Sequence, residues 1–331
     1  CAWSMAVFVL LISWLLLENT HVAGRRNAAR RVDAVDAGAS YEPERSDTVF
    51  LLQTAVTHEH TEYLPSDLQV SYSSRSKQAQ LPQGWRQVLE YVGREEVVEP
   101  LGAAMQLHGQ CGADWLVASL LGCRSRGFFV DLAAHDAVDL SNTLLLERDF
   151  GWDGVCIEAN PRYQLGLGRR RCQAVMAAVA SPSDELVNFT FKNEFGGIVG
   201  DGLDNAKNGY EETTKMRTVA LADVLRLVGA PAVVDYMSLD VEGAESLVMK
   251  DFPWDRYRFL VISVERPKPD LTLALEQHGY VHLRNNSDWD DETWIARSLV
   301  DSEALRGRFR NGAPREARTC MEERGYAWPN T

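Results

Sequence analysis

The chain lacks the features that several common classes of protein require. Its six cysteines form neither CxxC pairs nor the spacing of a zinc site. No G-x-G-x-x-G motif follows the apolar run at 128–131, so the fingerprint of a nicotinamide dehydrogenase is missing. Positive charge is scarce, because 34 Lys and Arg residues stand against 47 Asp and Glu residues and the net charge is −13. No ligand spacing therefore singles out a metal site, and the abundant carboxylates leave a metal-dependent mechanism open. The acidic charge predicts no binding to nucleic acid.

The apolar run near the N-terminus is shorter than a membrane-spanning helix, which needs about 20 residues. It extends from Met5 to Leu17, and Glu18 ends it. This length suits the apolar part of a secretory signal. We expect the segment to direct the chain to the secretory pathway, either to the endoplasmic reticulum or Golgi lumen or to the outside of the cell. Membrane anchoring through this segment and a buried core helix are the alternatives.

Two cysteine pairs are close enough in sequence to be bridged in such a compartment. They are Cys111 with Cys123 and Cys156 with Cys172. Cys156 falls inside a predicted strand, however, which favours a buried and inert thiol at that position. Short basic stretches at 25–31 and 169–171 are predicted to be solvated helix faces or flanks, because the chain as a whole is acidic.

The 331 residues and the 45% apolar content suffice for one α/β domain with an extension. The predicted regions are a signal peptide or anchor (1–24), a linker or stem (25–80), a helical extension (81–125), the main domain (126–300) and a C-terminal tail without an assigned role (301–331). In the extension, helical spacing is found for Trp85, Val88, Leu89 and Val92, and again for Trp115, Leu116, Ser119 and Leu120.

In the main domain, β-rich runs alternate with helical or loop sequence, which predicts a mostly parallel sheet with flanking helices. A third strand is expected at 174–180, and an antiparallel hairpin is expected at 280–284 and 292–296. The loop-like stretch 193–209 is either a mobile flap near the substrate or an exposed connection without function.

Four of the predicted strands finish on a carboxylate. These acids are Asp131, Glu158, Asp240 and Glu265. The carboxyl ends of parallel strands form the ligand crevice of an open sheet, so the acids are expected to gather there. Gathered carboxylates repel one another unless a cationic or hydroxyl-rich ligand lies between them, and S-adenosylmethionine has a sulfonium, an ammonium and a ribose diol. The alternative is that each acid caps the helix that follows its strand.

Three motifs of the main domain resemble those of one family. FFVDLAAHDAVDLSNT, GWDGVCIEANP and DYMSLDVEGAE are similar to motifs of the FkbM-type S-adenosylmethionine-dependent methyltransferases, over about residues 110–299. The resemblance implies a Rossmann-like class I methyltransferase fold with a seven-stranded sheet and S-adenosyl-L-methionine as the cofactor. It also implies methyl transfer to an oxygen nucleophile of a small-molecule or glycan acceptor, often a sugar hydroxyl.

The cofactor site is predicted from the ends of the first two strands of this domain. Asp131 is expected to pair with the ammonium of the cofactor. Glu158, at the end of the neighbouring strand, is expected to accept hydrogen bonds from both ribose hydroxyls. The remaining members of the predicted cofactor-binding set are Ala133, Asp136, Asn142 and Ala178. For Asp136, the alternative to cofactor binding is that it caps the turn that follows.

Three residues are candidates for the catalytic role. Asp240 and Glu242 stand at the tip of the fourth strand, where either one can orient or deprotonate the acceptor hydroxyl. His135 is a third candidate base because its ordinary pKa lies near ~6.5, although an exposed loop histidine without function is the alternative.

Alanines occupy positions 133 and 137, where the wider methyltransferase pattern has glycines. If the backbone has a positive φ there, each alanine costs about 1–2 kcal/mol and weakens cofactor binding without abolishing it. The sequence therefore leaves two functions open. One is an active O-methyltransferase, and the other is a non-catalytic methyltransferase-like module in which Ala133 and Ala137 fill the pocket and the domain binds a glycan or a protein.

Overall fold

The computed structural model describes residues 106–206, 213–283, 291–300, 321 and 323–326, and the backbone of strands β1 (Leu68–Tyr72) and β2 (Arg86–Gly93). The predicted signal segment, most of the linker and most of the C-terminal tail lie outside these residues, and the domain boundaries stay predictions. Within the described part, the structure contains no helix that is long and apolar enough to span a membrane.

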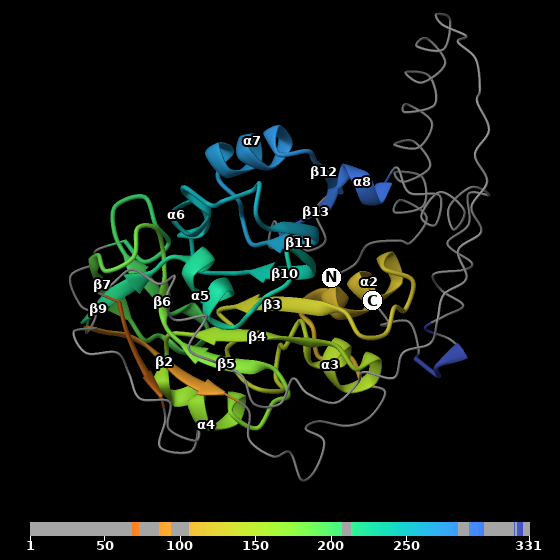
Figure 1. Ribbon diagram of the computed structural model, residues 1–331, viewed down its shortest axis with the longest axis horizontal. Helices are drawn as coiled ribbons and strands as arrows, with labels where there is room; N and C mark the ends of the chain where they lie inside the picture. The colour runs from red at the N-terminus through yellow and green to blue at the C-terminus, as the bar shows by residue number, and fades with distance from the viewer. Residues whose placement is uncertain are drawn as a thin grey trace, which may run out of the picture.

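A mixed sheet forms the centre of the molecule (Figure 1), and its nine strands follow the order β1-β2-β5-β4-β3-β10-β11-β13-β12. Strands β5 to β11 in this order are parallel, whereas β13 is antiparallel to both of its neighbours. The α/β class and the C-terminal hairpin are confirmed, but β1 and β2 extend the predicted seven strands to nine. The strands not yet given are β3 (Phe128–Leu132), β4 (Asp153–Glu158), β5 (Gln173–Met176), β10 (Val233–Leu239), β11 (Arg258–Val264), β12 (Tyr280–Leu283) and β13 (Glu292–Ala296).

One of the two helical predictions for the N-terminal extension is wrong. Residues 86–93 form strand β2, which pairs antiparallel with β5. The spacing of apolar residues in a short run is compatible with both a helix and a strand. Here the edge of β5 offers backbone hydrogen-bond partners, and pairing with it stabilises the strand. The second prediction is confirmed, because α2 (Ala113–Leu120) is a helix at the expected place.

The alternation of side chains along the strands separates two apolar cores. Val130 and Leu132 of β3 face a core that also contains residues of α5 (Leu221–Leu227), α6 (Glu245–Met249) and α7 (Pro269–Gln277). Phe129 faces the other core, beneath α2 and α3 (Leu144–Phe150). Asp131 is two residues from Phe129 in the same strand, so it lies on the face that α2 and α3 cover.

A smaller four-stranded sheet, in the order β6-β9-β7-β8, packs beside the carboxyl ends of the central strands. Its strands are β6 (Ala178–Val179), β7 (Leu186–Thr190), β8 (Gly197–Val199) and β9 (Thr214–Val219). The single strand predicted at 174–180 is therefore divided between β5 in the large sheet and β6 in the small one.

The stretch predicted as a flap is tied to the rest of the fold over its described part, 193–206. It contains β8, and Asp204 N donates a hydrogen bond of 3.2 Å to Glu242 O. Lys268 Nζ donates to Gly202 O at 2.7 Å. Residues 207–209 lie outside the described residues. The stretch thus forms one wall beside the turn that follows β10.

Candidate functional site

The ends of four adjacent parallel strands bring the predicted acids together. In the register of the sheet, Leu132 of β3 lies between Ile157 of β4 and Leu239 of β10. The residues that follow these three, together with the one that follows β11, are Ala133, Glu158, Asp240 and Glu265, so they stand at one level of the sheet. Asp131 lies opposite Ser238, one level lower.

Asp131, Glu158 and Asp240 line one cavity, which we call the acidic cavity. A second cavity adjoins it and shares Ala133 and Glu158 with it. This apolar cavity is lined by Ala178 and by residues of the small sheet, including Phe189 and Ile198. The structure therefore places the predicted cofactor residues Asp131, Ala133, Glu158 and Ala178 around two connected hollows.

Asp131 is almost completely buried, with 3% of its surface exposed. Its Oδ2 accepts a hydrogen bond of 2.5 Å from Thr143 Oγ1, whereas its Oδ1 has no hydrogen-bond partner among the described residues. Burial raises the pKa of Asp131, and the Thr143 hydroxyl and the nearby Arg170 oppose that rise. One oxygen of this carboxylate is thus available for a ligand.

Glu158 is held by backbone donors on both oxygens. Asn160 N donates to Oε1 at 2.8 Å and His135 N donates to Oε2 at 2.9 Å. Burial raises the pKa of Glu158, and these backbone hydrogen bonds lower it. Because a carboxylate oxygen has two lone pairs, each oxygen keeps one acceptor site for a ligand.

The turn after β3 contains two residues in the left-handed region. Ala133 has φ +63° and His135 has φ +52°. Ala137 is not among these residues; it lines neither cavity, and its Cβ faces Gly166. The condition for backbone strain is therefore met at Ala133 and not at Ala137, and the idea that both alanines fill the pocket fails for Ala137. The strain at His135 was not predicted from the sequence.

His135 lines the acidic cavity on the side of Glu158. Its Nε2 lies 2.6 Å from Tyr163 Oη, and the two rings are 4.3 Å apart. Its Nδ1 is buried and has no hydrogen-bond partner among the described residues. The ring is thus held by Tyr163 at the end of the cavity where Glu158 lies.

The remaining two predicted cofactor residues, Asp136 and Asn142, form hydrogen bonds to other parts of the protein through their side chains. Asp136 Oδ1 accepts hydrogen bonds from Val138 N and Asp139 N, which is the turn-capping alternative, and Asp136 lines neither cavity. Asn142 does line the acidic cavity. Its amide joins two neighbouring elements, because Oδ1 accepts from Gln110 N and Nδ2 donates to Ser238 Oγ.

Asp240 lines the acidic cavity on the side opposite Glu158, next to Glu265 of the neighbouring strand. Burial raises its pKa well above the ordinary range, and the Glu265 carboxylate raises it further. Glu265 Oε2 is buried and has no donor among the described residues. The neighbouring Glu265 carboxylate therefore disfavours the ionised form of Asp240.

Glu242 lies in the same turn as Asp240 but lines neither cavity. Arg266 Nη2 bridges it to two other acids, with distances of 3.2 Å to Glu242, 2.7 Å to Glu265 and 2.7 Å to Asp204. Burial raises the pKa of Glu242 to about 7. These three acids are close enough to hold a metal ion, but a guanidinium already lies among them. Of the two acids predicted for catalysis, only Asp240 reaches the cavity.

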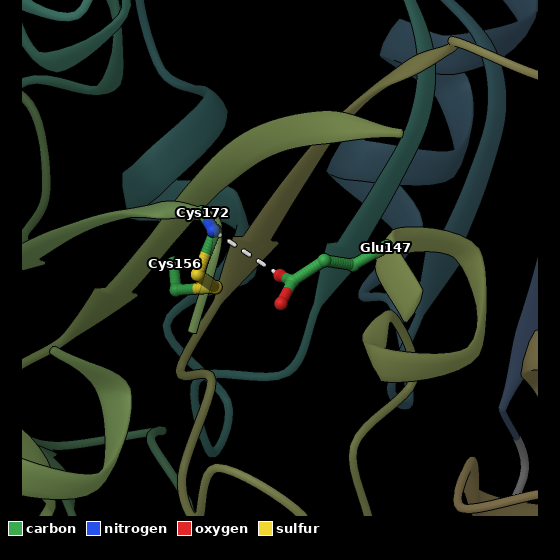
Figure 2. A group of neighbouring side chains, drawn as sticks. All are labelled: Glu147, Cys156 and Cys172. Carbon is green, nitrogen blue, oxygen red and sulfur yellow. Dashed lines mark hydrogen bonds between the residues drawn. A yellow bond between two sulfur atoms is a disulfide. The ribbon is translucent and has the colours of Figure 1, made fainter. Parts of the chain in front are cut away.

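The expectation of a free thiol at position 156 is wrong. Cys156 forms a disulfide with Cys172, and Cys111 and Cys123 are disulfide-bonded as well. Figure 2 shows this disulfide beside the carboxylate of Glu147, whose Oε2 accepts a hydrogen bond of 3.2 Å from Cys172 N. Because the two sulfur atoms are bonded to each other, this group is not a metal site. The bridge closes a separation of 16 residues, which stabilises the fold by about 3 kcal/mol.

The burial of Arg170 was not predicted from the sequence. Arg169 and Arg171 are exposed as predicted, whereas the Arg170 side chain is completely buried and forms an ion pair with Glu147. Nothing in the spacing of this basic run distinguishes its middle member.

The fold and the cavities define an α/β protein with two neighbouring cavities at the carboxyl ends of its central strands. Residues 131–282 match the family model described as the methyltransferase FkbM domain, which confirms the predicted resemblance over this segment. A comparison with curated proteins found no match.

Two solved methyltransferase structures are similar to this chain at low identity. One is the METTL16 methyltransferase domain, with 11% identity, coverage of 56% of this chain and 66% of that chain, and a TM-score of 0.33. The other is precorrin-6y C5,15-methyltransferase from Geobacter metallireducens GS-15, with 17% identity, coverage of 59% and 93%, and a TM-score of 0.30.

Proposed function

We propose that the protein is an S-adenosylmethionine-dependent O-methyltransferase that acts on a hydroxyl of a carbohydrate or another small molecule. The observation that carries this proposal is that Asp131, Glu158 and Asp240 line one cavity, within the segment that matches the FkbM methyltransferase model. Two of these acids suit the binding of a cation and a diol, and the third suits the removal of a proton.

The residues present fit the cofactor. S-adenosylmethionine supplies, when bound, the methyl group on its sulfonium sulfur. Asp131 offers its unpartnered Oδ1 to the ammonium, and Glu158 offers one acceptor site on each oxygen to the ribose hydroxyls. The adjoining apolar cavity, with Ala178, Phe189 and Ile198, offers an apolar surface to the purine base.

Asp240 is the proposed general base. It lies across the acidic cavity from Glu158, and its raised pKa makes its ionised form a stronger base than an ordinary aspartate. Gln110 and Asn193 line the same cavity. Amide side chains both donate and accept hydrogen bonds, which matches a hydroxyl-rich acceptor.

The secretory pathway is the proposed location, with membrane anchoring through residues 5–17 as an open alternative. The disulfides at Cys156–Cys172 and at Cys111 and Cys123 support an oxidising compartment. The second candidate function, a non-catalytic binding module, is favoured by one observation only. Ala133 adopts a positive φ and lines both cavities, at a position where a glycine would carry no strain and no methyl group.

Isothermal titration with S-adenosylhomocysteine tests the proposed function. We expect the wild-type protein to bind, and Glu158→Gln to weaken binding by at least about tenfold because one charged acceptor is lost. Glu276→Gln, on the exposed side of α7, serves as the control and should bind like the wild type. An absence of heat at millimolar ligand contradicts the proposal and favours the non-catalytic module.

A further inference from the structure

The buried guanidinium of Arg170 connects three parts of the cofactor side of the fold. Its Nε donates to Glu147 Oε2 at 3.0 Å, and its Nη1 donates to Ser141 Oγ at 3.0 Å and to Ala137 O at 3.3 Å. Its Nη2 donates to Thr143 Oγ1 at 3.0 Å. One side chain thus contacts helix α3, the residues before that helix, and the end of the turn that follows β3.

The direction of these hydrogen bonds determines whether the Thr143 hydroxyl donates its proton to Asp131 or accepts one from it. A guanidinium has donors and no acceptor, so Thr143 Oγ1 must accept from Arg170. The single proton of the Thr143 hydroxyl is then free to point at Asp131 Oδ2, which lies 2.5 Å away. A hydrogen bond donated to a carboxyl oxygen stabilises the ionised form of the acid more than the neutral form. The chain from Arg170 through Thr143 therefore favours the carboxylate form of Asp131.

We propose that Arg170 and Thr143 are positioning residues of the methyltransferase site, which hold Asp131 as a carboxylate that aims Oδ1 at the cationic end of the cofactor. The inference rests on the proposed function. Neither residue lines the acidic cavity, so both act through Asp131.

A disulfide joins the chain segment just after Arg170 to the central sheet. Glu147 accepts a hydrogen bond of 2.7 Å from Arg171 N. It also accepts one of 3.2 Å from Cys172 N, which is drawn in Figure 2. Cys172 is joined by its disulfide to Cys156 of β4, the strand next to the one that bears Asp131. The disulfide and the Glu147 hydrogen bonds thus tie the segment that bears Arg170 to the strand next to Asp131.

The charged and titratable groups around Asp131 act in both directions. Burial raises the pKa of Asp131, the Thr143 hydroxyl and Arg170 lower it, and Glu147 raises it further. Glu158 on β4 and Tyr236 on β10 interact electrostatically with Asp131 as well. Loss of the Thr143 hydroxyl removes one of the two groups that favour the carboxylate.

Thr143→Val is the decisive variant, because valine has the shape of threonine without the hydroxyl. Thr143→Ser keeps the hydroxyl and serves as the rescue. Thr218→Val is the control for the loss of a buried hydroxyl elsewhere, since Thr218 donates to Pro182 O and lines neither cavity. Arg170→Lys keeps a positive charge next to Glu147 but cannot reproduce the planar fork of donors.

The first measurement needs no ligand. The carboxyl carbon of Asp131 is followed by NMR through a pH titration of each folded variant. We expect the midpoint to move to higher pH in Thr143→Val and in Arg170→Lys, and to stay at the wild-type value in Thr143→Ser and Thr218→Val. An unchanged midpoint in Thr143→Val overturns the proposal, whether or not the protein binds the cofactor.

The second measurement is titration with S-adenosylhomocysteine as a function of pH. We expect Thr143→Val to bind about tenfold more weakly than the wild type at neutral pH and to recover part of that loss at higher pH. A Thr143→Val variant that is equally weak at every pH would indicate a merely structural role and overturn the proposal. If even the wild type fails to bind, the proposed function falls, and the NMR titration still decides the role of Arg170 and Thr143.

Discussion

The acids at the two sides of the site differ in how their charges are satisfied. On β3 and β4, Asp131 and Glu158 are buried, but a hydroxyl or backbone N–H donates to them. On the β10 and β11 side, carboxylates outnumber donors. Glu245 Oε2 and Glu265 Oε2 are buried without a partner among the described residues, and Arg266 is shared by three acids.

This difference shows that equivalent positions at strand ends can serve opposite purposes. Donors stabilise the ionised form of a buried acid, so Asp131 and Glu158 suit the recognition of a cation and a diol. Crowded carboxylates retain protons near neutral pH, and burial raises the pKa of both Glu242 and Glu245 to about 7. The second group is therefore suited to proton exchange.

The largest expected effect is on the rate of methyl transfer. Asp240→Asn removes the proposed base and should lower kcat by roughly 10²–10⁴-fold, whereas the Kd for S-adenosylhomocysteine should change little. Glu242→Gln is the comparison, because Glu242 lies in the same turn but lines neither cavity. Steady-state kinetics of both variants decide the assignment. A larger loss in Glu242→Gln would transfer the role of base to Glu242.

The next effect concerns the pH dependence of the reaction. The carboxylate of Glu265 raises the pKa of Asp240, so Glu265→Gln should lower it. The acidic limb of the profile of kcat/KM should then move to lower pH by about 1–3 pH units. The measurement is kcat/KM against pH for the wild type and the variant. An unmoved limb would mean that the two acids are not coupled.

A smaller effect is expected on stability. The pKa of Glu245 is about 7 in the folded protein against an ordinary value of 4.5, so the folded state binds more protons between these values. The free energy of unfolding therefore falls as pH rises from about 4.5 to 7. Glu245→Gln keeps an amide oxygen that can accept from Val241 N and Gly243 N, and it should reduce this fall by roughly 2–3 kcal/mol.

Urea denaturation across this pH range measures the Glu245 effect. Glu276→Gln on the exposed side of α7 is the control and should leave the curve unchanged. If Glu245→Gln and the wild type lose the same stability as pH rises, the excess of protons at this side of the site belongs to another group.

The smallest effect concerns backbone strain on the cofactor side. Ala133→Gly relieves a φ of +63° and removes a methyl group from both cavities, so the free energy of unfolding should rise by about 1 kcal/mol and cofactor binding should tighten by less than tenfold. Ala137→Gly has no such strain to relieve and should destabilise the fold. Denaturation and titration of both variants test this contrast. A gain of more than tenfold for Ala133→Gly would favour the non-catalytic module.

The central part of the fold could be predicted from local features of the sequence. Four strands of the central sheet are buried on both faces, so their sequences are continuous apolar and β-rich runs. Such runs identify a strand from sequence alone, and these four are followed or ended by Asp131, Glu158, Asp240 and Glu265. The hairpin formed by β12 and β13 could be predicted in the same way. The FkbM motifs lie at the ends of these strands and were recognised with them.

Other features depend on neighbours that are distant in sequence. Residues 86–93 became a strand because the edge of β5 was free to pair with them, and Cys156 was bridged because β4 and the segment before β5 run side by side. Arg170 was buried because Glu147, Ser141 and Thr143 converge on it. No local pattern distinguishes these residues from exposed or unpaired ones.

The sequence by itself determined which strands exist and which acids stand at their ends, since a buried strand and its terminal residue are properties of a few consecutive positions. Only the tertiary structure decided which of these acids receive hydrogen bonds from nearby donors and which lie beside other carboxylates. The donors that make this distinction come from other elements, and their distances to the carboxylates are set by the packing of the whole domain.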